Sequence, residues 1–150
     1  MIENLIEESI ALEKNVAALY KIFSESVPED ADFWWQLHLE EKSHATLIRA
    51  AKDSFVRRGK FPFDLIANSV EELKSSNQRI AAMVGKFLAN PPSRLEALEV
   101  AIALENEAGE SHYNQFMDKE AKNPVEGVFQ QLNRDDKEHE TRIRERLASV

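Results

Sequence analysis

Residues 34–51 read WWQLHLEEKSHATLIRAA, and apolar side chains recur there every three or four positions, which predicts one buried helical stripe. Two residues on that stripe are polar. Glu41 and His44 are one helical turn apart, so the spacing places a carboxylate beside an imidazole on the face that should be buried. A buried ionised carboxylate is costly unless it is paired or bound to a cation. This stretch therefore predicts a core helix that carries a polar site.

The same feature recurs on three further apolar stripes. A lone glutamate lies on two of them, and the last carries a second carboxylate and imidazole pair with the same spacing. Four carboxylates and two imidazoles suit two divalent ions with bridging carboxylates. The predicted ligands are Glu13, Glu41, His44, Glu105, Asp136 and His139.

Prolines divide the chain into five predicted helices, because proline interrupts helical hydrogen bonding. Ser93 is a plausible N-cap, with Glu96 completing a capping box. The expected helices are Ile2–Ser26, Asp30–Arg57, a segment of roughly 20 residues ending before Asn90, a segment from Ser93 to about Lys122, and a segment from Pro124 nearly to the C-terminus. The third has a plain apolar stripe of Val70, Leu73, Ile80, Val84 and Phe87.

The site motifs form two similar halves. In each half a lone glutamate is followed, one helix later, by a carboxylate-x-x-His pair. For such halves to face each other, the second and fourth helices must run parallel, so the chain must cross the bundle between them. The third helix, roughly 30 Å long at 1.5 Å per residue, is suited to that crossing.

Composition excludes several classes of protein. The chain has 150 residues and no cysteine, so disulfides, cysteine-bound zinc and iron–sulfur clusters are excluded. A formal charge of −8 argues against a nucleic-acid partner. No apolar stretch approaches membrane-spanning length and the N-terminus resembles no signal peptide, so a cytoplasmic protein without a membrane partner is expected. Short linkers predict one domain over residues 1–150.

With these motifs the chain resembles the ferritin-like superfamily, and within it the rubrerythrin-like branch. The resemblance covers nearly the whole chain and is carried by ALEKNVAALY, HLEEKSH, ALENEAGESHY and DDKEHE. It implies an all-α, ferritin-like four-helix bundle with an additional crossover helix. It also implies a non-haem di-iron carboxylate oxidoreductase that reacts with peroxide or dioxygen.

The resemblance assigns roles to the site residues. Two iron ions, with manganese or zinc possible, would be held by the six predicted ligands. Tyr20 and Tyr113 match tyrosines that donate hydrogen bonds to ligand carboxylates, whereas His38 and His112 are expected beside the ligands or in the core. Electrons would come from a separate donor, and a homodimer is possible, with Trp35 as an interface residue.

Three positions depart from the rubrerythrin pattern. Ala108 stands where a further glutamate ligand is usual. Asp136 is one methylene shorter than the usual glutamate, and Asp135 or Glu138 could substitute for it. Without cysteine, the chain lacks the rubredoxin domain that supplies electrons in full-length rubrerythrins.

Two alternatives to an oxidoreductase follow from the same residues. One is a protein that oxidises and binds iron for storage or handling, and the other is a metal-free helical scaffold that acts by association.

In the metal-free protein we expect the clustered carboxylates to repel one another, which would raise the pKa of each.

Overall fold

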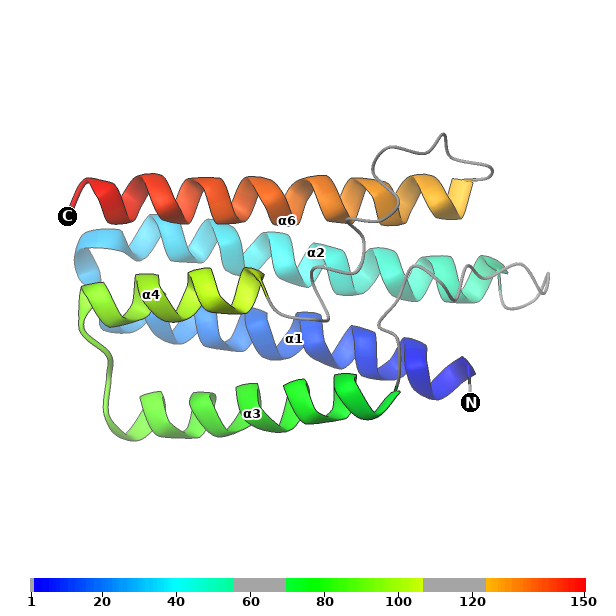
Figure 1. The fold of residues 1–150 in the computed structure, drawn as a ribbon, viewed down its shortest axis with the longest axis horizontal. Helices are drawn as coiled ribbons and strands as arrows, with labels where there is room; N and C mark the ends of the chain where they lie inside the picture. The colour runs from blue at the N-terminus through cyan, green and yellow to red at the C-terminus, as the bar shows by residue number, and fades with distance from the viewer. Residues whose placement is uncertain (1, 56–69, 107–123) are drawn as a thin grey trace.

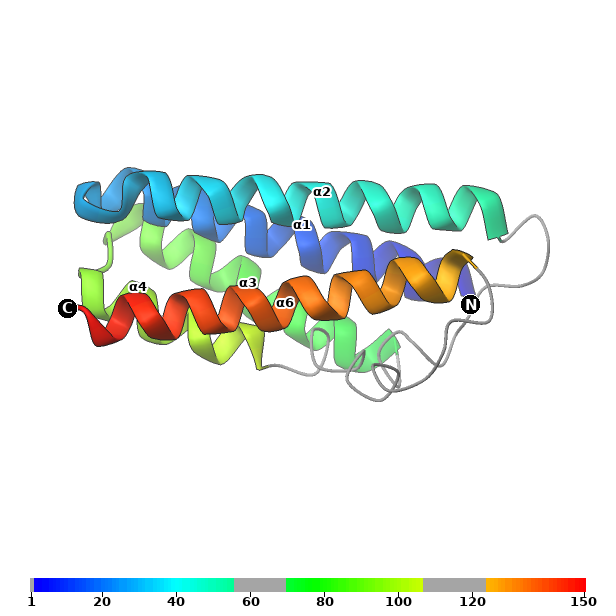
Figure 2. The same cartoon turned by 90° about the horizontal axis from the view of Figure 1, so that it is seen from above.

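The computed structural model describes residues 2–55, 70–106 and 124–150, and every regular element in these ranges is helical (Figures 1 and 2). The elements are α1 (Ile2–Ser26), the 3₁₀ turn η1 (Pro28–Asp30), α2 (Ala31–Phe55), α3 (Val70–Ala89), α4 (Arg94–Glu105) and α6 (Pro124–Ala148). The all-α prediction is confirmed for these residues. None of the helices described combines the length and apolar character needed to cross a membrane.

Most of the predicted helix boundaries that fall within the described residues are confirmed, and the end of the fourth helix is the exception. The predicted end of the second helix at Arg57 lies outside the described residues. Ser93 caps α4 as expected, since its side chain accepts a hydrogen bond from the Glu96 backbone N–H at 3.1 Å. The helix nevertheless ends at Glu105, short of the predicted Lys122. The Asn106 side chain donates to the Ile102 carbonyl, a local bond that competes with the helical ladder. Residues 107–123 lie outside those described.

The helices lie side by side along one long axis. Helix α1 packs against α2 and α3, whereas α6 packs against α2 and α4. Helices α2 and α4 run in the same direction, and α1, α3 and α6 run in the opposite direction (Figure 1). This arrangement brings together the inner faces of the four helices that carry polar residues on their apolar stripes.

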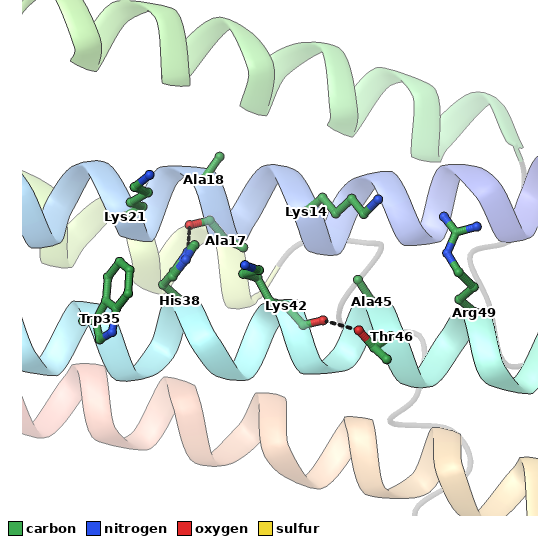
Figure 3. Close-up of a pocket in the computed structure, with 10 residues that line it drawn as sticks. All are labelled: Lys14, Ala17, Ala18, Lys21, Trp35, His38, Lys42, Ala45, Thr46 and Arg49. Atoms are coloured by element: carbon green, nitrogen blue, oxygen red, sulfur yellow. Dashed lines mark hydrogen bonds between the residues drawn. The ribbon is translucent and has the colours of Figure 1, made fainter.

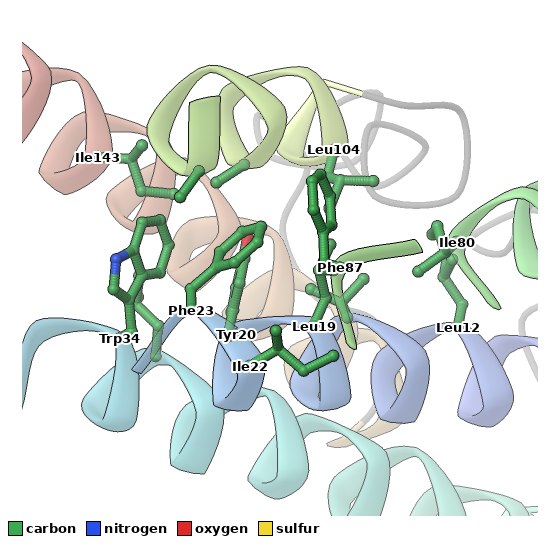
Figure 4. Close-up of a cluster of buried hydrophobic side chains, with 14 of the residues drawn as sticks. Leu12, Leu19, Tyr20, Ile22, Phe23, Trp34, Ile80, Phe87, Leu104 and Ile143 are labelled. Atoms are coloured by element: carbon green, nitrogen blue, oxygen red, sulfur yellow. The ribbon is translucent and has the colours of Figure 1, made fainter. Parts of the chain in front are cut away.

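Aromatic side chains pack against one another within the core (Figure 4). Phe23 of α1 lies 5.0 Å from the Trp34 ring and 5.7 Å from the Phe87 ring, measured between centroids, with both contacts edge-on. Tyr20 lies 5.3 Å from Trp34. Such pairs contribute about 0.5–1.5 kcal/mol each beyond the burial of their area. The cluster therefore joins α1, α2 and α3 at one end of the molecule.

The stripe of α3 is less uniform than the sequence predicts. Leu73, Ile80 and Phe87 are buried as expected, but Asn77 lies on the same face. Its amide donates to the Glu8 carbonyl at 2.9 Å and accepts from Asn15 at 2.9 Å. Because a buried amide needs partners, these bonds fix the position of α3 along α1.

An ion pair closes the end of the bundle where α2 begins. The Arg94 guanidinium donates two hydrogen bonds, of 2.8 and 3.0 Å, to the buried Asp30 carboxylate. Arg146 lies 3.5 Å from the same carboxylate. Since the three residues belong to η1, α4 and α6, the pair joins segments distant in sequence. Asp30 lies in η1, one residue before α2 begins.

Adjacent residues near the end of α3 provide a test of its packing. Phe87 is buried in the aromatic cluster, whereas the Leu88 side chain is 66% exposed. We expect Phe87→Ala to lower the free energy of unfolding by about 3–5 kcal/mol, since it removes a large buried side chain and leaves a cavity. Leu88→Ala should change it by less than about 0.5 kcal/mol. Urea denaturation of both variants would measure the difference, and equal losses would contradict the packing of α3.

Candidate metal centre

The six residues predicted as ligands meet in the interior of the bundle. Helix α1 provides Glu13, α2 provides Glu41 and His44, α4 provides Glu105, and α6 provides Asp136 and His139. Each is between 0% and 5% exposed. They form two overlapping groups whose potential ligand atoms lie within 4.8 Å of one another: Glu13, Glu41 and His44, and Glu41, Glu105, Asp136 and His139.

Glu41 belongs to both groups and faces both imidazoles. Its Oε1 lies 3.0 Å from His139 Nδ1, and its Oε2 lies 3.5 Å from His44 Nδ1. The two imidazole rings stack with centroids 5.4 Å apart and planes 15° apart. The other carboxylates lie slightly farther from the same nitrogens. His44 Nδ1 is 3.6 Å from a carboxylate oxygen of Glu13 and of Asp136, and His139 Nδ1 is 3.6 Å from one of Glu105.

The outer nitrogen of each imidazole faces another carboxylate. His44 Nε2 lies 3.3 Å from Asp135 Oδ2, and His139 Nε2 lies 3.4 Å from Glu40 Oε1. Each of these carboxylates immediately precedes a predicted ligand in the sequence and faces the histidine of the other helix. Carboxylates in this position hold an imidazole in one orientation and tautomer.

Glu40 is the site residue that the sequence reasoning missed. The sequence contains a signal for Glu40. Each x-x-His motif follows two adjacent carboxylates rather than one, Glu40-Glu41 in one case and Asp135-Asp136 in the other. Asp135 was expected only as a substitute ligand. Glu138, the other proposed substitute, is exposed and lies 3.7 Å from Arg142, away from the cluster.

Tyr20 contacts the carboxylate of Glu105, one of the predicted ligands, as expected. Its phenol donates a 2.6 Å hydrogen bond to Glu105 Oε1 and so links α1 to α4. Glu105 Oε2 is buried and has no hydrogen-bond partner among the residues described. A buried oxygen of this kind is costly to leave unmatched, and a cation is one way to satisfy it.

His38 lies elsewhere in the structure. Its Nδ1 donates to the Ala17 carbonyl at 2.7 Å, and its ring lies 4.8 Å from that of Trp35, between α1 and α2. His112, Tyr113 and Ala108 lie outside the described residues.

Both histidines of the cluster hold their protons strongly. Burial alone would lower the pKa of His44, but contacts with Glu13 and Glu41 outweigh it and raise the pKa to about 11. Burial likewise opposes the charged form of His139, and contacts with Glu105, Glu40 and Glu41 overcome it and raise its pKa. The metal-free cluster therefore contains imidazolium ions among its carboxylates.

These imidazolium ions overturn the expectation that every clustered carboxylate has a raised pKa. Burial raises the pKa of Glu41, but contacts with Glu13, His139 and His44 outweigh it, and the pKa lies well below the usual range. Contact with His139 likewise lowers the pKa of Glu40, to about 2. For Glu105 the expectation holds, since burial and the charge of Glu41 raise its pKa despite His139 and Tyr20.

The donor set fits a divalent metal. Carboxylate oxygens and imidazole nitrogens are ligands for iron, manganese and zinc, and the overlapping groups offer two positions that share Glu41. These buried residues could therefore hold metal ions.

The raised histidine pKa values predict how the stability of the metal-free protein depends on pH. A histidine with a raised folded-state pKa stabilises the fold fully below its unfolded value of 6.5, and this contribution is lost as the pH rises toward the folded value, about 11 for His44. We expect the free energy of unfolding, measured by urea denaturation with chelator present, to fall from pH 6.5 to about pH 9.

Two variants sharpen this measurement. His44→Gln should flatten the fall, because one of the titrating groups is removed, whereas Glu138→Gln, at an exposed position of α6, should preserve it. A stability that stays level or rises over this range in the unsubstituted chain would show that the histidines are not held as imidazolium ions.

Comparisons with known proteins leave the chain unassigned to a family. No family model, curated protein or solved structure matched it. The candidate metal centre therefore rests on the chain's own residues and their geometry.

Proposed function

We propose that this chain is a rubrerythrin-like, non-haem di-iron carboxylate oxidoreductase that reacts with peroxide or dioxygen. In this proposal its fold is a ferritin-like four-helix bundle in which α3 is the crossover helix. The shared direction of α2 and α4, with α3 running back between them in the chain, supports that assignment (Figure 1).

One observation carries the proposal. Four helices contribute six buried side chains to two overlapping ligand groups, and the groups share Glu41. A carboxylate with one oxygen toward each group is suited to bridge two ions. Glu13 and His44 would complete one position, and Glu105, Asp136 and His139 the other.

When bound, two iron ions supply two electrons to an oxidant, and manganese or zinc would occupy the same ligands without the same redox chemistry. The chain's own residues prepare the site for this charge. Asp135 and Glu40 orient the imidazoles, and Tyr20 holds one oxygen of Glu105 in place. Each imidazole must lose a proton before it can bind metal, so metal uptake should release protons. A separate donor must then restore the electrons.

A metal-free scaffold is the competing function, and one observation favours it. The two imidazolium ions partly neutralise the buried carboxylates, so the cluster has internal compensation without metal. The metal content of the protein separates the two functions directly.

Anaerobic loading with ferrous iron tests the metal centre. We expect about two ions per chain by elemental analysis, together with a higher melting temperature, since a ligand that binds only the folded state stabilises it. Glu41→Gln should reduce both occupancies because Glu41 serves both groups. Glu13→Gln should affect one of the two.

Glu138→Gln is the matched control for loading, since its carboxylate is 64% exposed on the helix that carries Asp136 and His139. It should bind iron like the unsubstituted chain. Absence of uptake, with no change in melting temperature, would sink the di-iron proposal and favour the scaffold.

The oxidant is tested by mixing the reduced, iron-loaded protein with peroxide or dioxygen in a stopped-flow instrument. Following the rubrerythrin resemblance, we expect oxidation by peroxide to be at least as fast as oxidation by dioxygen. Repeated turnover with an added reductant would support an oxidoreductase. A clear preference for dioxygen, with stoichiometric iron uptake and no turnover, would instead indicate iron oxidation for storage.

A further inference from the structure

A positively charged groove lies between α1 and α2, apart from the metal ligands (Figure 3). Its volume is about 520 Å³. Lys14 and Lys21 line it from α1, and Lys42 and Arg49 line it from α2. Four cations around one groove are notable in a chain whose formal charge is −8.

Three of these cations are available to a ligand. Among the described residues, Lys14, Lys21 and Lys42 form no close ion pair, and Lys14 acts on Glu7 only over a longer distance. Arg49 lies 4.0 Å from Glu7, which is engaged more closely by Lys52 at 2.5 Å. Ammonium groups that share a concave surface without carboxylate partners repel one another, and a bound anion would relieve that repulsion.

The floor and one end of the groove are apolar. Ala17, Ala18 and Ala45 contribute to the lining, and Trp35 lies at the end opposite Arg49 (Figure 3). The Trp35 side chain is 44% exposed, and its inner neighbour His38 is fixed by its hydrogen bond to the Ala17 carbonyl. The exposed indole of Trp35 packs beside the fixed His38 ring, so its other face offers a flat surface on which an aromatic ring can stack.

We propose that this groove binds a small phosphorylated aromatic compound, of the mononucleotide or flavin mononucleotide type. The ring packs against Trp35 and the alanine floor, and the phosphate lies among Lys14, Lys21 and Lys42. The proposal goes beyond the di-iron function, since neither the groove nor its ligand requires the metal centre.

Size and charge favour a small ligand over a macromolecule. A volume of about 520 Å³ lies within the range of roughly 300–1,000 Å³ typical of small-molecule sites. Four cations line the groove, and Glu7 lies at its Arg49 end. A long polyanion would meet the negative charge of the rest of the molecule, whereas a single phosphate meets only the lysines.

The test uses the full chain after removal of metal, so that its failure is distinguishable from failure of the di-iron proposal. Flavin mononucleotide is titrated by its own fluorescence, and adenosine monophosphate by Trp fluorescence. We expect saturable binding of at least one phosphorylated probe that weakens with salt, and binding about tenfold weaker for the matching compound without phosphate, riboflavin or adenosine.

Variants assign the binding to the groove. The double variant Lys14→Gln, Lys42→Gln should weaken the phosphorylated probe by about tenfold or more and abolish its preference over the phosphate-free compound. Trp35→Leu should weaken both forms to a similar degree. Lys74→Gln, at an exposed position of α3, is the matched control and should leave binding unchanged.

Three outcomes would overturn the proposal. The first is the absence of saturable binding of either phosphorylated probe up to about 1 mM. The second is an affinity for riboflavin or adenosine equal to that for the phosphorylated compound. The third is a loss of binding in Lys74→Gln as large as in the double lysine variant. Sedimentation of the ligand-free chain gives a further test. If the chain is a dimer and Trp35→Asp disrupts it, a second copy covers the groove, and the proposal is also overturned.

Discussion

The structure depends on one physical constraint, the burial of several carboxylates and two imidazoles at the centre of a small helical bundle. Desolvation makes each charge costly, so the charges must compensate one another or bind cations. Glu41 is the centre of this compensation because each of its oxygens faces a different imidazole. The arrangement of the four helices that carry the cluster brings these charges together.

Two further sets of contacts hold that arrangement. Glu40 and Asp135 reach across between α2 and α6, each to the histidine of the other helix. Tyr20 connects α1 with α4 through Glu105, and its ring also packs on Trp34. One tyrosine thus belongs to the apolar core and the polar cluster together, so a change in core packing would be transmitted to a carboxylate of the cluster.

Helices α1 and α2 present two chemically different faces. Glu13 and Glu41 are buried, whereas the residues that follow them, Lys14 and Lys42, line the groove. Adjacent helical residues point about 100° apart, so a change of one position moves a side chain from the interior to the outer face. An acidic interior and a basic groove are in this way built from the same two helices, without any irregularity in either.

From the sequence alone, periodicity determined the helical class and the six residues that meet in the buried cluster, because the face on which a helical residue lies is a local property. Prolines and the Ser93 cap determined most of the described helix boundaries, because they interrupt or begin a helix locally. Tertiary structure decided what those residues meet. The contact of Glu40 with His139, the position of Asn77 against α1 and the opposite pKa shifts of Glu41 and Glu105 all depend on neighbours from other helices. Spacing along one helix carries no information on the distance to a charge on the next, and at these separations that distance sets the electrostatic energy.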